Sequence, residues 1–157
     1  MAKIRFDLNS TLAPATILAA ATDFTPRRPD LWPNIDRGIY QLHGAGEGWA
    51  EVTEGSAVMG GIWARERYEW STPGCVRATV QDSNVFRPGG VWELAATALD
   101  GGGSHVTVLN HRQAKGLKGH LLGAMLTIMG GKVMPRATRR TLEIAREEVR
   151  DDQNVAP

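Results

Sequence analysis

The strongest constraint on the fold is a series of strands divided by short breaks rich in glycine and proline, followed by one long helical segment. The strands lie within residues 38–114, and the helical pattern covers residues 116–150. The breaks fall at residues 44–48, 60–61, 72–74, 87–90 and 100–103. Because no helix-length pattern separates these strands, neighbouring strands are predicted to pair antiparallel. A curved antiparallel sheet that meets a single long helix leaves a space between the two, so the sequence predicts an α+β protein with an internal cavity.

Length, charge and cysteine content exclude several classes of protein. With 157 residues the chain is expected to form one domain over residues 1–150, followed by a frayed tail at residues 151–157. The formal net charge of +1 gives no indication of nucleic-acid binding. A single cysteine, Cys75, rules out an internal disulfide and a cysteine-rich zinc site.

Targeting and cofactor signals are also missing from the sequence. The N-terminal residues show no secretory signal, and no apolar stretch is long enough to span a bilayer, so we expect a cytoplasmic protein. The histidines His43, His105, His111 and His120 lack the spacing of a metal site. We therefore expect neither a metal nor another cofactor.

Alternation along the strands predicts which side chains face the interior. In the first strand the apolar side chains alternate with polar ones from Lys3 to Ser10. In residues 62–71 the predicted inward face carries Ile62, Ala64, Glu66, Tyr68 and Trp70, and Trp63 is predicted to face outward. The following strands are predicted to point inward with Val76, Ala78, Val80 and Asp82, then with Trp92 and Leu94, and finally with Val106, Val108, Asn110 and Arg112.

The closing helix is predicted to pack across the concave face of the sheet. An apolar stripe in its first half contains Leu121, Leu122, Met125, Leu126, Met129 and Val133. Proline lacks an amide hydrogen and clashes with the preceding turn, so we expect a bend within residues 130–135, which contain Gly130, Gly131 and Pro135.

The order of elements resembles the START-like helix-grip (SRPBCC) superfamily, in particular its small polyketide cyclase/dehydrase and lipid-transport type. The resemblance covers residues 4–149. The segments that carry it are Ile4-Arg5-Phe6, Ser10-Thr11-Leu12-Ala13-Pro14-Ala15, Asp30-Leu31-Trp32-Pro33, Glu66-Arg67-Tyr68-Glu69-Trp70 and the helix from Leu121 onward. It implies a seven-stranded sheet that grips the last helix around a cavity for an apolar or aromatic ligand. Because members include carriers, sensors and aromatase/cyclases, the fold does not choose among these functions.

The predicted ligand-binding residues come from the inward faces and the helical stripe. They are Glu66, Tyr68, Trp70, Val80, Asp82, Trp92, Asn110, Arg112, Leu122, Met125 and Met129. Core filling is the competing interpretation of the tryptophans and the methionines. Glu66 is the anomaly, because an unpaired buried carboxylate is unfavourable, and we expect Arg112 as its partner, or else Asn110 or a ligand. The inward charges could form a structural pair, orient a ligand or carry out acid/base catalysis.

Three functions from different classes remain open at this point. The first is a non-catalytic carrier or binder of a small hydrophobic, lipid-like or polyketide-like molecule. The second is an aromatase/cyclase-type enzyme in which Glu66 or Asp82 moves protons and Tyr68 or Arg112 stabilises an enolate-like oxygen. The third is a protein-interaction module with an exposed apolar patch around Trp63. The ligand, and the choice between monomer and dimer, cannot be read from the sequence.

Overall fold

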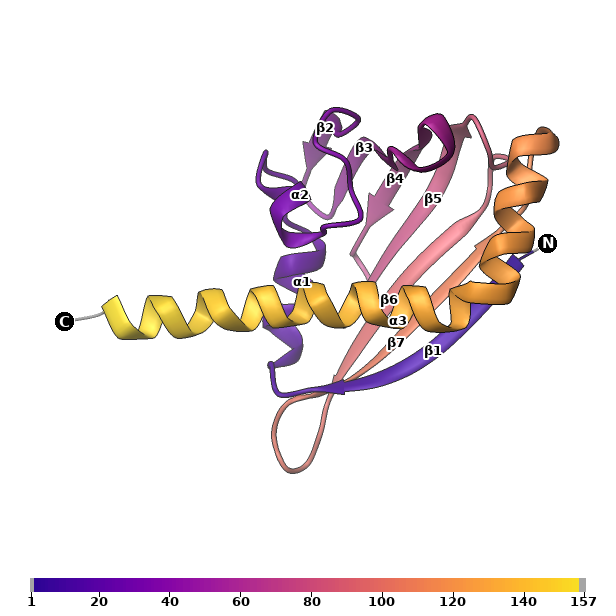
Figure 1. Cartoon of the computed structure of the whole chain (residues 1–157). Coiled ribbons are helices and arrows are strands. Elements are labelled where there is room, and N and C mark those ends of the chain that lie inside the picture. Colours follow the sequence, from indigo (N-terminus) through magenta and orange to yellow (C-terminus); the bar gives the residue numbers. More distant parts are fainter. Residues whose placement is uncertain (1, 156–157) are drawn as a thin grey trace.

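The computed structural model describes residues 2–155 and shows a curved antiparallel sheet against helices (Figure 1). The strands are β1 (Ala2–Ser10), β2 (Gln41–Gly46), β3 (Trp49–Ser56), β4 (Ile62–Glu69), β5 (Cys75–Ser83), β6 (Val91–Ala98) and β7 (Ser104–Arg112). Their order in the seven-stranded sheet is β1-β7-β6-β5-β4-β3-β2. Consecutive strands from β2 to β7 therefore pair with each other, and β1 pairs with β7. The helices are α1 (Pro14–Ala21), α2 (Arg28–Leu31) and α3 (Gly116–Val155), with a short 3₁₀ turn, η1, at Val58–Gly60. The predicted helix-grip architecture is confirmed.

The predicted inward faces of the strands are also confirmed for most of the sheet. Ala64, Glu66 and Tyr68 of β4 are buried, whereas Arg65 between them and Glu69 after them are exposed. The same alternation holds for Val106 and Val108 of β7. β1 and β7 pair in continuous register from Ala2 opposite Arg112 to Ser10 opposite Ser104. The first and last strands of the sequence are therefore neighbours in the sheet.

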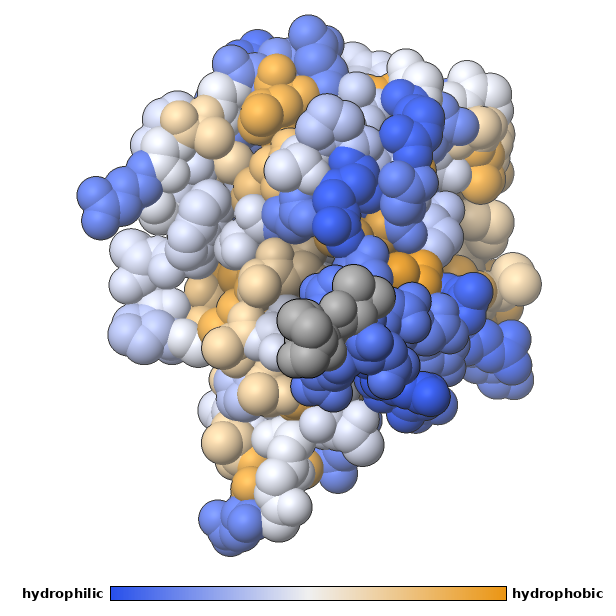
Figure 2. All heavy atoms as spheres, turned by 90° about the vertical axis from the view of Figure 1, so that its left-hand side faces the viewer, coloured by the Kyte–Doolittle hydropathy of each residue, from blue (hydrophilic) through white to orange (hydrophobic). Residues whose placement is uncertain are grey.

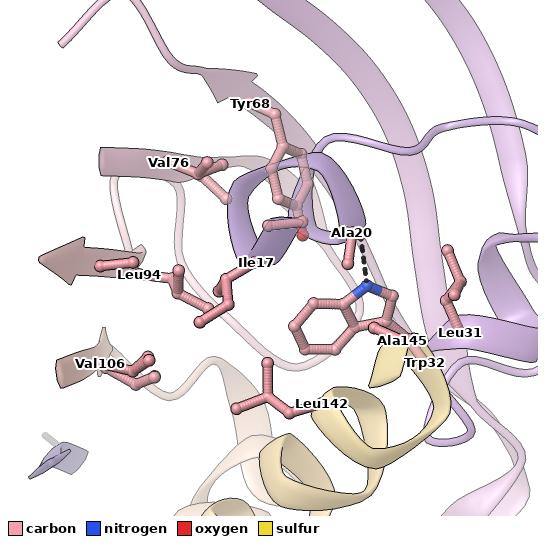
Figure 3. Packing of buried hydrophobic residues seen from close by; sticks show 14 of the residues in the cluster. Ile17, Ala20, Leu31, Trp32, Tyr68, Val76, Leu94, Val106, Leu142 and Ala145 are labelled. Carbon is pink, nitrogen blue, oxygen red and sulfur yellow. Dashed lines mark hydrogen bonds between the residues drawn. The ribbon is translucent and has the colours of Figure 1, made fainter. Parts of the chain in front are cut away.

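The core lies between the sheet, α1 and the second half of α3. Ile17 of α1, Leu94 and Val106 of the sheet, and Leu142 and Ala145 of α3 belong to one buried cluster (Figure 3). Trp32 closes this cluster next to α2, where its indole nitrogen donates a hydrogen bond of 3.1 Å to the carbonyl oxygen of Ala20. This packing places α2, with its buried Arg28, against the sheet and so helps to form the cavity described below.

The position of the first half of α3 corrects the sequence-based prediction. Figure 1 shows that α3 bends sharply in its middle, where Pro135 lies within the helix. The second half crosses in front of the sheet, and the first half is carried toward the sheet edge. Of the predicted stripe only Leu122 is buried, whereas Leu121, Met125, Met129 and Val133 are exposed; the side chains of Leu126, Gly130 and Gly131 lie outside the described set. The helix continues through residues 151–155 of the expected tail, and residues 156–157 lie outside the described part.

The outer surface of the second half of α3 is charged. Arg139, Arg140, Glu143, Arg146 and Glu147 are exposed, and Arg140 pairs with Glu143 at 3.3 Å. Figure 2 shows hydrophilic residues gathered around this end of the molecule. Charges of both signs at spacings of three and four residues are typical of such a solvated helix face.

Gly119 permits the close approach of α3 to the β5–β6 connection. A Cβ atom at Gly119 would lie 2.2 Å from the carbonyl oxygen of Val85, a distance that requires the backbone to move. We therefore expect Gly119→Ala to lower the free energy of unfolding by about 1–3 kcal/mol in urea denaturation, as for other overpacked sites. The matched control is Gly123→Ala one turn later, where the nearest atom is 4.0 Å away. There alanine should stabilise the helix by up to about 1 kcal/mol. Equal effects of the two changes would contradict the close packing at Gly119.

Candidate ligand site

A cavity of about 190 Å³ lies between the sheet, the α2 region and α3. Its aromatic walls come from Trp32, Trp63, Tyr68, Phe86 and Trp92. Its polar and remaining lining residues are Arg28, Asn34, Ile35, Glu54, Gly55, Ser56, Ile62, Ala64, Glu66, Asn110, Arg112 and Met134. The cavity therefore combines a largely aromatic wall with buried charges, which is the composition of a pocket that orients its ligand through a few polar groups.

A second cavity of about 160 Å³ lies beside the first half of α3. Its helical wall consists of small and polar residues, namely Gly119, His120, Gly123, Ala124 and Thr127. Ile4 of β1 and Ala114 complete it on the sheet side. Phe86, Asn110 and Arg112 line both cavities. These three side chains thus form the boundary between the two spaces.

Five of the predicted ligand-binding residues line the first cavity. They are Glu66, Tyr68, Trp92, Asn110 and Arg112. The strand alternation brings them together because β4, β6 and β7 present the same face to the interior. Trp63, which was predicted to face outward, is half-buried and contributes to the cavity wall, so the structure does not support an apolar interaction patch centred on it.

The other predicted residues lie outside both cavities. Trp70 stacks on Phe24 with ring centroids 5.7 Å apart. Val80 and Leu122 are buried in a small separate core cluster, and Met125 and Met129 are exposed on α3. These placements follow from the bend of α3 and from core packing that strand and helix periodicity cannot distinguish from a cavity lining.

Asp82 is displaced from the interior by an irregularity in β5. Pairing shifts between Arg65 and Glu66 of β4, which leaves Gln81 without a partner in the register. A one-residue shift moves a side chain to the other face of a sheet. Asp82 therefore lies opposite the exposed Arg65, its side chain is 59% exposed, and it is 3.6 Å from the ammonium group of Lys115.

Glu66 and Arg112 form the buried ion pair that the sequence predicts. An Nη2 hydrogen of Arg112 is donated to Oε1 of Glu66, whose side chain is only 3% exposed. The Arg112 guanidinium also lies 5.0 Å from the centre of the Phe86 ring, within the range of a cation–π contact. Phe86 and Glu66 thus hold the guanidinium at the boundary between the cavities.

A second buried ion pair, Arg28 with Glu54, was not predicted. Nε of Arg28 donates to Oε1 of Glu54, and the Tyr68 hydroxyl donates to Oε2 of the same carboxylate at 3.1 Å. Nη1 of Arg28 donates to the carbonyl oxygens of Ala21 and Asp23, both at 3.1 Å. Glu54 follows Ala50 and Val52 on the inward face of β3, so alternation could have identified it. The sequence carries no comparable signal for Arg28, because its burial depends on how α2 docks.

Two buried atoms at the cavity boundary lack hydrogen-bond partners among the described residues. They are Oδ1 of Asn110, an acceptor, and Nε of Arg112, a donor. The Asn110 amide nitrogen reaches only the sulfur of Met134, at 3.5 Å. Buried polar atoms are usually paired, and an exception calls for a water or a ligand. Residues 110 and 112 share one face of β7, and both line the two cavities.

Burial controls the protonation of the cavity's titratable groups. Burial raises the pKa of Glu66, and the neighbouring Arg112 opposes the rise only in part. The pKa of Tyr68 is raised well above its ordinary value, mainly by burial and to a smaller extent by the negative charges of Glu54 and Glu66. The Tyr68 hydroxyl is therefore neutral at physiological pH and remains a hydrogen-bond donor to Glu54.

The raised pKa of Glu66 predicts a specific pH dependence of stability. Between the unfolded pKa near 4.5 and the raised folded value, the folded protein keeps a proton that the unfolded chain loses. Stability attributable to Glu66 is thus present at low pH and is lost as pH rises through the folded pKa, by at most about 1.4 kcal/mol per pH unit. We expect the melting temperature of the wild type, relative to Glu66→Gln, to fall as the pH rises above 4.5 in a series of thermal melts. Parallel curves would show that Glu66 titrates normally.

Comparisons with solved structures agree with this architecture. No protein-family model matches the sequence, and no curated protein matches it. The fold is similar to that of the Zhui aromatase/cyclase from Streptomyces sp. R1128, with a TM-score of 0.77, 12% identity and 94% of each chain covered. A START superfamily protein from Mycobacterium smegmatis matches with a TM-score of 0.62 and 12% identity, over 87% of this chain and 97% of that one. The di-domain ARO/CYC StfQ from the steffimycin biosynthetic pathway matches with a TM-score of 0.70 and 11% identity, over 98% of this chain and 52% of that one.

These likenesses show that the chain has the START-like helix-grip fold. Within the described residues no helix is long and apolar enough to cross a membrane. The same residues contain no cluster of three or more histidine, cysteine, aspartate or glutamate side chains suited to a metal ion.

Proposed function

We propose that this helix-grip protein binds a small hydrophobic ligand, aromatic and with at least one oxygen substituent, in the cavity between the sheet and α3. The observation that carries the proposal is the pairing of aromatic walls with the unpartnered Asn110 Oδ1 and Arg112 Nε at one end. Neighbours with this fold include aromatase/cyclases and a START superfamily protein. Polyketide-like and lipid-like molecules are thus the ligand classes to examine. We further propose that the protein acts in the cytoplasm.

The two unpartnered atoms define what the ligand must offer. The Nε hydrogen of Arg112 requires an acceptor, such as a carbonyl, hydroxyl or phenol oxygen, and Oδ1 of Asn110 requires a donor, such as a hydroxyl. A phenolic or enolic hydroxyl group supplies both. The apolar part of the molecule would lie against Trp32, Tyr68 and Trp92, where burial of its surface provides most of the affinity. The Glu66–Arg112 pair keeps the guanidinium in place for this contact.

The proposal is tested first with the protein as purified. Native mass spectrometry, followed by denaturation and extraction, should reveal a bound compound with aromatic or polyunsaturated character and an oxygen substituent. Titration of ligand-free protein with 2-naphthol and with naphthalene, followed by tryptophan fluorescence, should show tighter binding of the hydroxylated compound. If no compound is retained and neither probe binds, the ligand-site assignment is wrong.

A second candidate function is acid/base catalysis of the aromatase/cyclase type, favoured by the buried Glu66 with its raised pKa. A carboxyl group with a pKa nearer neutrality can both accept and return a proton in the working pH range. In the dehydration step of such a reaction Glu66, as the carboxylate, would take the α-proton of a β-hydroxy ketone formed by ring closure of a poly-β-keto chain. It would pass this proton to the β-hydroxyl group, which leaves as water while a C=C bond forms. Arg112 would stabilise the enolate-like oxygen in between. Asp82, the other acid considered from the sequence, is excluded from this role by its exposed position.

Glu66→Gln separates binding from catalysis. If Glu66 is catalytic, turnover of a poly-β-keto thioester mimic should collapse and its binding should survive. If Glu66 only holds Arg112 in place, 2-naphthol affinity should fall, and no turnover should be detectable in the wild type. If the substitution lowers the melting temperature and leaves both binding and turnover unchanged, the ion pair has a purely structural role.

A further inference from the structure

The first half of α3 exposes a stripe of large apolar side chains. Leu117 is 79% exposed, Leu121 is 56% exposed and Ile128 is 83% exposed. Met125 and Met129 are also exposed. The spacings from Leu117 to Leu121, Met125 and Ile128 are four, eight and eleven residues, which place these side chains on one side of the helix. Contiguous apolar surface of this kind is uncommon on a protein that has no partner for it.

The orientation of the helix explains why these side chains point outward. Gly119, Gly123, Ala124 and Thr127 line the second cavity together with His120, so the face of α3 directed toward that space carries small and polar residues and no large apolar ones. The close contact between Gly119 and the Val85 carbonyl fixes this rotation of the helix. Turning the large residues inward would place a side chain where the Gly119 backbone now meets Val85.

A second element exposes apolar side chains at the same end of the molecule. Val58 and Met59 of η1 are exposed, and Met59 adopts the left-handed conformation with a φ of 55°. The ammonium group of Lys118, in the first turn of α3, donates a hydrogen bond of 2.6 Å to the carbonyl oxygen of Gly61, directly after η1. Figure 1 shows η1 and the start of α3 at the same end of the molecule. The apolar surface thus includes two elements that are distant in the sequence.

The charged side chains of the first half of α3 have one sign. Residues 101–142 contain no aspartate or glutamate. The exposed cations of this stretch are Lys115, Lys132, Arg136, Arg139 and Arg140. Lys115 pairs with Asp82 at 3.6 Å and Arg140 with Glu143 at 3.3 Å, and Lys118 is partly buried against Gly61. A helix with exposed apolar residues and nearby cations suits the surface of an anionic bilayer, in which the apolar side chains enter the headgroup region and the cations meet the phosphates.

We propose that the first half of α3, together with η1, docks the protein on the surface of a membrane that contains anionic phospholipid. A second copy of the chain fits the surface less well, because self-association would bring the same cations close together. The docking surface borders both cavities: η1 lies between the lining residues Ser56 and Ile62, and the small-residue face of α3 lines the second cavity. The proposal does not depend on the identity of the ligand.

Co-sedimentation of the full chain with vesicles tests the proposal. The protein should bind vesicles of phosphatidylcholine mixed with phosphatidylglycerol, and binding to pure phosphatidylcholine should be at least about tenfold weaker. The double variant Leu121→Ser/Ile128→Ser should lose at least about tenfold in affinity for the anionic vesicles, as should Lys132→Gln/Arg136→Gln. Thermal melts establish that each variant is folded, which is expected because all four side chains are exposed.

The matched control is Leu42→Ser/Leu99→Ser, which removes two exposed leucines from β2 and from the β6–β7 connection. This variant should bind anionic vesicles as the wild type does. The proposal is overturned if the wild type does not bind them, if pure phosphatidylcholine binds equally well, or if the control loses as much affinity as Leu121→Ser/Ile128→Ser. It is also overturned if size-exclusion chromatography shows a dimer that Leu121→Ser/Ile128→Ser dissociates, since the stripe would then be a contact between copies.

Discussion

Replacing Arg28 with methionine should lower the free energy of unfolding by about 3–5 kcal/mol, the usual result of removing one partner of a buried ion pair. The Arg28 side chain is 2% exposed and that of Glu54 is 11% exposed, so the remaining carboxylate would be left largely without solvent or a counterion. The carbonyl oxygens of Ala21 and Asp23 would lose their guanidinium donor at the same time. Urea denaturation followed by circular dichroism measures the loss.

Two further variants show whether burial of the pair causes this effect. Arg37→Met removes an arginine whose side chain is 60% exposed and which pairs with Asp30, so it should change stability by no more than about 1 kcal/mol. Adding Glu54→Gln to Arg28→Met should recover part of the loss, because the variant no longer buries an unpaired carboxylate. If Arg28→Met is as mild as Arg37→Met, the pair contributes little to stability.

Arg112→Met should weaken binding of 2-naphthol by about 10- to 150-fold, which corresponds to loss of a hydrogen bond from a charged donor. Binding of naphthalene, which has no oxygen, should change far less. Because the substitution also removes the partner of Glu66, the same comparison is made in the Glu66→Gln background, where no carboxylate is left unpaired. Fluorescence titrations of both compounds against each variant provide the affinities.

The control for Arg112→Met is Arg77→Met, which removes an exposed arginine from an ion pair with Glu93 on the outer face of the sheet. It should bind both compounds as the wild type does. If Arg112→Met lowers the affinity for naphthalene and 2-naphthol equally, the guanidinium shapes the cavity without contacting the ligand's oxygen.

The inward face of the sheet could be predicted from the sequence because it depends on the alternation of residues within each strand. Side chains in a strand alternate between two faces, so the rows from Ala64 to Tyr68 and from Val106 to Arg112 identify the buried side without knowledge of the neighbours. The same rows place Glu66 and Arg112 on one face, and the demand for a buried counterion then predicts their pairing. The bulge at Gln81 could not be predicted in this way, because it depends on how β4 and β5 pair. It moves the side chain of Asp82 from the predicted inward face to the outward face.

The helix and the α2 region show what local patterns cannot predict. The apolar stripe of α3 identifies one face of the helix, but the direction of the bend near Pro135 decides whether that face meets the sheet or the solvent. Gly119 gave no signal in the sequence, although its contact with Val85 helps to fix the rotation of the helix. Burial of Arg28 likewise results from docking of a four-residue helix against β3, which no periodicity records.

A crystal structure of the protein with 2-naphthol tests the central claim most directly. The account predicts that the naphthalene ring lies among Trp32, Tyr68 and Trp92, with its hydroxyl group within hydrogen-bond distance of both Arg112 Nε and Asn110 Oδ1. Density for the compound only on the exposed surface of α3, or ordered water alone beside Asn110 and Arg112 at saturating 2-naphthol, would contradict it.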